Sequence, residues 1–311
     1  MFDKLGIVTN CLAKRLADND RFERLIEDFV QNGFMHIEIR DGNYLRKSEF
    51  GEILQGLETA MQHYSDSEWQ RLCVAVHDHN SNDVPWLQTQ DRRSINRIGQ
   101  LLQISSELVL SYAIAHPWMD RPENRVEDDA GIIRGKKLAY LLSPTKARLR
   151  LVHMVVEQAV DENTAVSNLH RYQSLTPECP VTLAVENSQL PPYVILNLAT
   201  QGNACLAYDE ANNYYQDGMT IGDTKLFWER VESRQLISVH LKQKNHVGVR
   251  ARLGDGFVDL PVLVNRLLDL SYGGDWLLEY RATDRPIQDA IQSRKVLLKH
   301  KVDTRVQRAR H

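Results

Sequence analysis

The sequence predicts an α/β protein with a single closed (β/α)₈ barrel that occupies residues 1–311. Short apolar runs, each about as long as one buried strand, alternate with longer amphipathic segments along the whole chain. Eight such runs occur, and each is followed by sequence with helical spacing. Strict alternation of strands and helices favours a parallel sheet, and eight such units close into a barrel. Glu, Asp or His residues end most of these runs, often 39 residues apart, as at 38, 77 and 116 and at 240 and 279.

The first half of the chain supplies four of the predicted strands, at 4–10, 34–42, 72–80 and 107–117. The predicted helices between them are 12–32, 47–64 and 92–105. In the first of these helices apolar residues recur at helical spacing, and Gly33 follows where a C-terminal cap belongs. The segment IVTNCLAKRL after the first strand contains no glycine. An open doubly wound sheet, the alternative fold, would usually carry a glycine-rich first turn there.

The second half begins with a charged loop at 121–131, followed by predicted helices at 132–141, 146–160 and 162–173. The other four strands are expected at 181–186, 204–209, 236–241 and 275–280. Helices are expected at 192–200, 223–232 and 259–271, with a final helix at 286–300. No linker and no repeat longer than one βα unit is visible, so we expect one domain.

Composition excludes several classes of protein. The net charge of −3 and the pI of about 6.4 argue against a nucleic acid as the main partner. No apolar run approaches the roughly 20 residues of a membrane span, and no membrane partner is expected. The four cysteines form no CxxC pair, which favours reduced thiols in a cytoplasmic protein. The basic tail at 294–311 is expected to be exposed, and a subunit contact of a homo-oligomer is the alternative.

The stretch VTLAVENS at 181–188 reads as a buried strand that ends in a carboxylate, Glu186. Such a group needs a cation or hydrogen bonds. Asp209, His240 and Glu279 end the three strands that follow, and active sites of such barrels lie at the carboxyl ends of the strands. Three carboxylates with one imidazole favour one divalent metal ion, Mn²⁺ or Mg²⁺, with Co²⁺ or Zn²⁺ as alternatives. The ion would hold the carboxylates in their ionised form.

Other strand ends offer candidate substrate contacts. Glu38, His77 and His116 end earlier predicted strands, and we expect His77 rather than His79 to face the cavity. The alternative for each is a hydrogen-bonded residue of the core or the rim. Lys242 lies two residues after His240 and therefore on the same side of its strand, where it could neutralise substrate charge.

A basic segment follows the seventh predicted strand. The loop 242–252, KQKNHVGVRAR, contains no acidic residue, and Arg281 follows the last strand. Because barrels often bind anionic groups near their last two strands, this cluster suggests a phosphorylated or carboxylated substrate. A solvated charged lid is the alternative. We interpret the LGDG segment at 253–256 as a turn, because it lacks the Lys-Ser/Thr end of a phosphate-binding loop.

Four stretches together resemble the xylose isomerase-like barrels, which include sugar-phosphate isomerases and epimerases. They are GFMHIEIRDG at 33–42, LAVEN at 183–187, HLKQ at 240–243 and LGDGFVDL…LSYGGDWLLEYR at 253–281. In that family a strand glutamate, an aspartate, a histidine and a last-strand glutamate bind one divalent ion. The resemblance places these ligands at Glu186, Asp209, His240 and Glu279.

The resemblance implies a metal-dependent isomerase or epimerase of a small polyhydroxylated, keto-sugar-like substrate. The ion would bind the oxygens of an α-hydroxy-carbonyl group and stabilise an enediolate. Glu186 and Glu279 would remove and return the proton, a contribution of about 10²–10⁴-fold. A dehydratase using the same ligands is one alternative. A barrel that binds a sugar-like ligand or a partner protein without turnover is another.

Three positions depart from the epimerase pattern. Asn212 replaces a histidine, His246 replaces an arginine and Pro192 replaces a substrate-contacting glutamate. Asn212 and His246 remain candidate substrate contacts, but these changes argue against a simple keto-hexose. The related AP endonucleases use three zinc ions and an Asp-x-His pair shortly before LGDG. Gly248 and Arg250 stand near those places here, which disfavours DNA cleavage.

Overall fold

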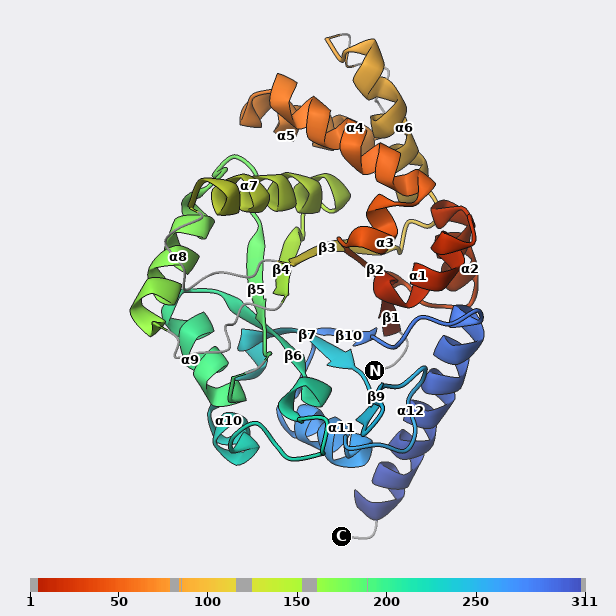
Figure 1. Ribbon diagram of the computed structural model, residues 1–311, viewed down its shortest axis with the longest axis vertical. Helices are drawn as coiled ribbons and strands as arrows, with labels where there is room; N and C mark the ends of the chain where they lie inside the picture. The colour runs from red at the N-terminus through yellow and green to blue at the C-terminus, as the bar shows by residue number, and fades with distance from the viewer. Residues whose placement is uncertain are drawn as a thin grey trace.

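The computed structural model shows a closed barrel of eight parallel strands surrounded by helices, which confirms the predicted fold class (Figure 1). It describes residues 5–78, 84, 86–115, 125–152, 161–188 and 190–308. The barrel strands are β1 (Leu5–Val8), β2 (His36–Arg40), β3 (Val109–Ala115), β4 (Arg148–Val152), β5 (Thr182–Glu186), β6 (Cys205–Asp209), β7 (Leu236–Leu241) and β10 (Asp275–Leu278). They follow one another around the barrel in sequence order, and β10 pairs with β1 to close it.

Helices connect the strands on the outside of the barrel (Figure 1). They are α1 (Ala13–Ala17), α2 (Phe22–Gln31), α3 (Asn43–Arg46), α4 (Glu49–His63), α5 (Asp66–His77), α6 (Thr89–Leu102), α7 (Arg125–Leu142), α8 (Glu162–Ser174), α9 (Pro192–Gln201), α10 (Thr224–Arg230), α11 (Leu260–Asp269) and α12 (Pro286–Arg308). Short 3₁₀ turns lie at η2 (Thr9–Leu12), η4 (Glu210–Asn213) and η5 (Ser233–Gln235). A two-stranded hairpin, β8 (Lys244–Asn245) with β9 (Gly248–Val249), extends from the end of β7.

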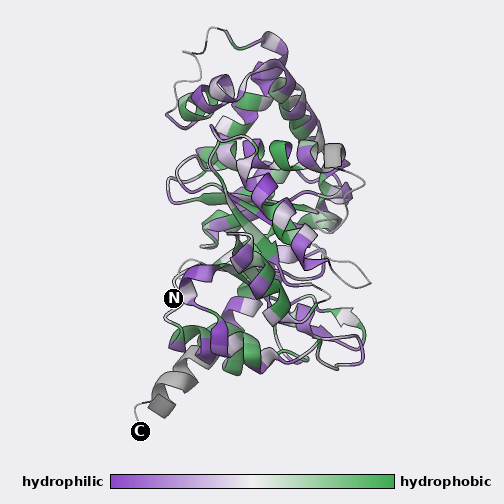
Figure 2. Cartoon of the chain, turned by 90° about the vertical axis from the view of Figure 1, so that its left-hand side faces the viewer, coloured by the Kyte–Doolittle hydropathy of each residue, from purple (hydrophilic) through white to green (hydrophobic). Residues whose placement is uncertain are grey.

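Figure 2 shows the hydrophobic stretches concentrated in the strands and on one face of many helices. Most of these apolar residues form one continuous core cluster between the sheet and the helices. Among the described residues, no helix is long and apolar enough to cross a membrane.

The predicted strand at 72–80 was wrong, because residues up to His77 belong to helix α5. Ser65 caps this helix in a capping box with Glu68. Trp69, Leu72, Cys73 and Val76 are buried, and their spacing of three and four residues places them on one face of a helix. The short apolar run LCVAV has the composition of a strand, but the residues before it start a helix.

The region of the predicted helix at 146–160 contains strand β4 instead, and residues 153–160 lie outside the described residues. In RLRLV the side chains alternate between the two faces of the strand, so Leu149 and Leu151 pack in the apolar cluster. Arg150 lies on the opposite face, inside the barrel. The charged loop expected at 121–131 is also shorter than predicted, because α7 begins at Arg125.

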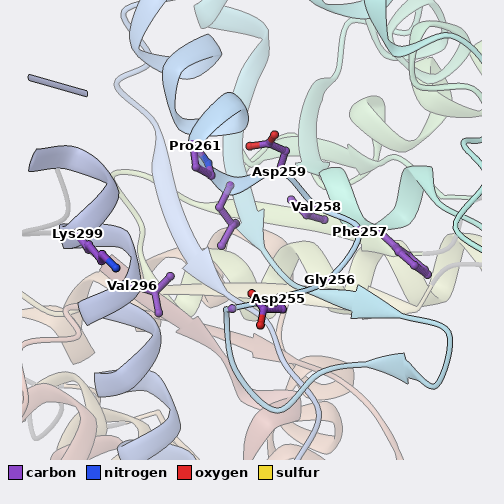
Figure 3. A pocket seen from close by; sticks show the side chains of 10 residues that line it. Asp255, Gly256, Phe257, Val258, Asp259, Pro261, Val296 and Lys299 are labelled. Carbon is purple, nitrogen blue, oxygen red and sulfur yellow. The ribbon is translucent and has the colours of Figure 1, made fainter. Parts of the chain in front are cut away.

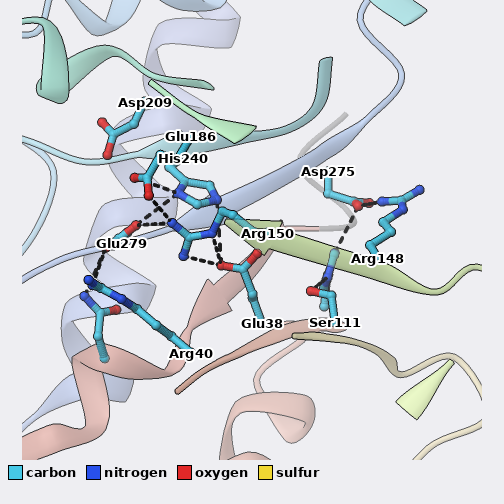
Figure 4. A network of polar contacts seen from close by, with 12 residues as sticks. Glu38, Arg40, Ser111, Arg148, Arg150, Glu186, Asp209, His240, Asp275 and Glu279 are labelled. Carbon is cyan, nitrogen blue, oxygen red and sulfur yellow. Dashed lines mark hydrogen bonds and ion pairs between the residues drawn. The ribbon is translucent and has the colours of Figure 1, made fainter. Parts of the chain in front are cut away.

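The interior of the barrel carries an unusual number of polar side chains. Interiors of such barrels are usually filled by branched apolar residues. Here charged or polar residues of seven strands and of the segment after β10 face inward, in two clusters that Figure 4 shows. One lies near the amino ends of the strands, around His36 and Asp275, and the other lies at their carboxyl ends.

Candidate metal centre

Four side chains meet at the carboxyl ends of the strands. Glu186 ends β5, Asp209 ends β6, His240 lies in β7 and Glu279 directly follows β10. Each offers one ligand atom, and these atoms all lie within 4.8 Å of one another. Among the described residues they form the one group of this kind, and all four side chains are buried. We call these four residues the cage.

The cage has the dimensions of a single metal site. Bonds from a divalent ion to oxygen or imidazole nitrogen are about 2.1 Å long, so ligand atoms on opposite sides of one ion lie about 4.2 Å apart. A spread of up to 4.8 Å is close to that separation. The four residues therefore need only small side-chain movements to share one ion.

Several buried atoms of the cage have only ion-pair contacts and no hydrogen bond of good geometry within the described residues: Oδ2 of Asp209, both ring nitrogens of His240 and Oε2 of Glu279. Oδ2 of Asp209 lies beside Nζ of Lys242, Nδ1 of His240 lies 3.0 Å from Oε2 of Glu279, and Nε2 of His240 lies 3.8 Å from Oε1 of Glu38. Buried polar atoms nearly always have a hydrogen-bond partner in folded proteins. A bound cation would satisfy the two oxygens and one of the nitrogens, so the donor set fits a divalent metal ion.

Arg150 is the central cation of this region and is almost fully buried (Figure 4). Its Nη1 donates to Oε2 of Glu186 at 2.7 Å, and its Nε donates to Oε1 of Glu38 at 2.9 Å. Nη2 forms a second contact with Glu38, and Nη1 lies 3.9 Å from Oε2 of Glu279. One guanidinium thus bridges three carboxylates that come from different strands.

Lys242 is a second buried cation. Its Nζ pairs with Oδ2 of Asp209 and lies 4.0 Å from Oε1 of Glu279. Arg40 and Asn10 also contact Glu279, and each donates to its Oε1 at 3.2 Å. Every cage carboxylate therefore has at least one basic side chain beside it.

The pKa shifts follow from burial and from these cations. Burial of Glu186 raises the pKa of its carboxyl group, but Arg150 and Lys242 outweigh that effect and lower it overall. Lys242, His240 and Arg150 likewise outweigh burial at Glu279 and hold its pKa well below the usual range. The pKa of Asp209 is raised, because burial and the two neighbouring glutamates exceed the effect of Lys242.

Neighbouring amides fix the orientation of the cage. The backbone N–H of Asp209 donates to Oδ1 of Asn187 at 2.7 Å, and Nδ2 of Asn187 donates back to the Asp209 carbonyl at 2.8 Å. Oδ1 of Asp209 accepts from the N–H of Ala211, which leaves Oδ2 on the cage side. Asn212 donates to Oε1 of Glu186 at 3.0 Å. Asn212 therefore touches the cage at the position where the epimerase pattern has a histidine.

The structure brings Glu38 and Lys242 next to the cage, as expected from their strand positions. His77 is different, because it is the last residue of α5 and its Nε2 lies 2.8 Å from the carbonyl oxygen of Leu141. It lines a cavity of about 510 Å³ beside the residues that precede β3 and β4, at the amino ends of these strands. The expected strand-end position of His77 was therefore wrong. His116 and His79 lie outside the described residues.

The basic loop lies at the surface. His246 is exposed on the β8–β9 hairpin, and its ring packs against Phe257 at a centroid distance of 4.9 Å. Arg281 is also exposed, and its backbone N–H donates to the carbonyl of Arg250. Neither side chain belongs to the buried set around the cage.

The LGDG segment forms a loop that Gln243 holds in place. The side-chain amide of Gln243 donates to the carbonyls of Gly254 and Val258 and accepts from the N–H of Val258. An open cavity of about 630 Å³ lies between this loop and α12, lined by Asp255, Asp259 and Lys299 among others (Figure 3). Its lining residues include none of the cage residues.

Sequence reasoning missed Arg150 and Arg40 as parts of the site. Arg150 was assigned to a helix, although the alternation of RLRLV indicates a strand with both arginines on one face. Arg40 shares the inward face of β2 with Glu38, since the two lie two positions apart in the strand. That spacing was sufficient to find it.

Several solved structures have a fold similar to that of this chain. A xylose isomerase domain-containing protein from Salmonella typhimurium matches with a TM-score of 0.62, 14% identity, and coverage of 96% of this chain and 98% of that one. The IOLI protein, whose structure holds a zinc atom, matches with a TM-score of 0.58, 15% identity, and coverage of 96% and 97%. The chain has the xylose isomerase-like TIM barrel fold.

The solved structures with a similar fold include a D-tagatose 3-epimerase-like protein, an L-ribulose 3-epimerase and an AP endonuclease of family 2. An L-ribulose 3-epimerase, for example, matches with a TM-score of 0.58, 15% identity, and coverage of 99% of this chain and 98% of that one. No protein-family model and no curated protein sequence matches the chain. The likeness therefore lies in the fold.

Proposed function

We propose that the protein is a divalent-metal-dependent isomerase or epimerase of a small polyhydroxylated α-hydroxy-carbonyl compound. The observation that carries the proposal is the convergence of Glu186, Asp209, His240 and Glu279, whose potential ligand atoms all lie within 4.8 Å of one another. Sugar epimerases among the solved structures with this fold support the reaction class. The oxygen-rich donor set with one imidazole favours Mn²⁺ or Mg²⁺, and Zn²⁺ is the ion in the IOLI protein.

The four cage residues would hold the ion at the mouth of the barrel. When bound, the ion supplies a positive charge that acidifies the proton between a carbonyl and a hydroxyl group and stabilises the negative charge that follows. Lys242 touches Asp209 and Asn212 touches Glu186, so both could donate hydrogen bonds to substrate oxygens beside the ion. Lys242 also suits a substrate that carries a carboxylate or phosphate.

Glu186 and Glu279 would exchange the proton. The lowered pKa values of both carboxyl groups keep them ionised at neutral pH, as a general base requires. Arg150 and Asn212 orient Glu186, whereas Arg40 and Asn10 orient Glu279. Because β5 and β10 are separated by β6 and β7 in the barrel, the two carboxylates approach a bound substrate from different sides. Return of the proton to the same carbon would give an epimer, and return to the neighbouring carbon would give an isomer.

The test is proton exchange in D₂O. The protein, reconstituted with Mn²⁺, is incubated with a panel of ketoses, sugar phosphates and sugar acids, and deuterium incorporation next to the carbonyl is followed by NMR. We expect at least one compound to exchange and to form an epimer or isomer. Glu186→Gln and Glu279→Gln should abolish the exchange and leave the far-UV circular dichroism unchanged. Release of an unsaturated product would indicate a dehydratase instead, and full exchange in both variants would contradict the proposal.

A further inference from the structure

We infer that Arg150 and Lys242 are internal counter-ions of the cage, which hold its carboxylates together without metal and compete with the metal for them. The inference rests on the metal site of the proposed function and is independent of the reaction. It assigns these two residues control over the metal affinity.

The charges inside this end of the barrel are close to balance before any metal binds. Four acidic side chains meet here, namely Glu38, Glu186, Asp209 and Glu279. Among the described residues, Arg150 and Lys242 are the buried arginine and lysine that contact them, the imidazole of His240 lies 3.0 Å from Oε2 of Glu279, and Arg40 adds a third permanent positive charge at the rim. Four negative charges therefore face three positive ones. Without the buried pair, like charges in a water-poor cavity would repel one another strongly.

The two buried cations occupy the ligands that a metal needs. Arg150 donates to a carboxylate oxygen of Glu186 at 2.7 Å, and Lys242 contacts the otherwise unpartnered Oδ2 of Asp209. A divalent ion entering the cage must share or displace both contacts, and it is repelled by both positive charges. Each cation therefore weakens metal binding while it stabilises the empty site.

Arg150 and Lys242 differ in the carboxylate partners that remain to them once the metal binds. Arg150 makes two further contacts with Glu38, which lies outside the cage, so it retains a partner if Glu186 turns to the metal. The carboxylates beside Lys242, Asp209 and Glu279, are both cage ligands. Arg150 is thus the better residue for a test, because its removal leaves the four ligands intact.

The test measures Mn²⁺ binding by calorimetry and thermal unfolding of the chelator-stripped protein. We expect Arg150→Met to bind Mn²⁺ at least about tenfold more tightly than the unmodified protein. The metal-free variant should also unfold several degrees lower, because buried carboxylates lose their partner. Arg150→Lys, which keeps the charge, should bring both the Mn²⁺ affinity and the unfolding temperature most of the way back to those of the unmodified protein.

Arg148→Met is the matched control, since Arg148 lies two residues earlier on the same inward face and pairs with Asp275. It should leave the Mn²⁺ affinity within twofold.

A purely structural role for Arg150 would lower both stability and metal affinity, and that result would overturn the inference. Unchanged affinity in Arg150→Met would overturn it as well. If Arg150→Met does not fold, Arg150→Gln, which keeps a hydrogen-bond donor but not the charge, takes its place with the same expectation. Loss of sugar turnover does not affect this measurement, because no substrate is present. Failure of every variant to bind Mn²⁺ would contradict both the inference and the proposed metal site.

Discussion

The two ends of the barrel interior differ in their charge, although both are polar. At the amino end, Asp275 pairs with Arg148, and His36 lies between Asp275 and Ser111 at 3.4 Å and 2.8 Å. At the carboxyl end, the cage and Glu38 bring four acids together (Figure 4). Buried atoms without hydrogen bonds occur at both ends, in His36 and Asp275 as well as in the cage.

An orphaned polar atom is therefore a weak indicator of a ligand site in this molecule. The excess of acids distinguishes the two ends, because the amino end has one acid for one arginine. A balanced cluster can be stable by itself, whereas the acid-rich cluster gains most from an added cation. The carboxyl end is thus predicted to bind metal and the amino end to support the fold.

The largest expected difference between the two ends concerns activity. Glu279→Gln should reduce kcat by about 10²–10⁴-fold, because the variant loses a proton-transfer group and a metal ligand. Asp275→Asn, four residues earlier in the same segment, should leave kcat within a few-fold. Steady-state kinetics on the substrate found by exchange would measure both. Similar losses in the two variants would remove the distinction between the ends.

The amino end should add its own dependence of stability on pH. Burial, partly opposed by Glu38, lowers the pKa of His36 to about 4. The unfolded chain, with a histidine pKa of about 6.5, binds more protons between these values, so stability falls as the pH falls through this window. The contribution is roughly 3 kcal/mol, from about 1.4 kcal/mol per pH unit. Urea unfolding at pH 7 and pH 4.5 should show a smaller decrease for His36→Gln. An identical decrease would contradict the prediction.

Metal binding should stabilise the protein only through the carboxyl end. Mn²⁺ at about 100 times its Kd should add about 2.7 kcal/mol to the free energy of unfolding. Asp209→Asn should abolish this gain, whereas Asp275→Asn should keep it. Thermal unfolding with and without a chelator provides the measurement. A gain that persists in Asp209→Asn would place the ion elsewhere.

The smallest expected effect is that of the amino-end ion pair. The side chains of Arg148 and Asp275 are 29% and 25% exposed, so solvent screens their attraction. Arg148→Met should therefore cost no more than about 1 kcal/mol of stability. Urea unfolding at pH 7 would measure it, and a cost of several kcal/mol would mean that both ends depend equally on their charges.

Seven of the eight barrel strands could be predicted from sequence, and β4 could not. The strands β5, β6, β7 and β10 each bury an apolar run that ends in, or leads directly to, one cage residue, and the sequence located all four. The total of eight strands was correct because two errors compensated each other. Helix α5 was mistaken for a strand, and β4 was missed.

The strand β4 was missed because its charged side chains point into the barrel, where residues far away in sequence neutralise them. In β4, as in β2, charged or polar side chains occupy the inward positions, so neither strand has the continuous apolar pattern of a parallel sheet. The charges of Arg150 are satisfied by Glu38 and Glu186, which are 112 and 36 residues away in sequence. Local sequence patterns do not reveal such partners. The cage was predictable because its residues end strands, whereas its counter-ions depend on contacts across the barrel.

Whether Glu186, Asp209, His240 and Glu279 share one divalent ion can be determined by anomalous diffraction from crystals soaked in Mn²⁺. We expect one strong anomalous peak at the carboxyl end of the barrel, about 2.0–2.3 Å from a ligand atom of each of the four side chains. Absence of a peak there at saturating Mn²⁺, with Arg150 still bound to Glu186 and Lys242 to Asp209, would contradict it.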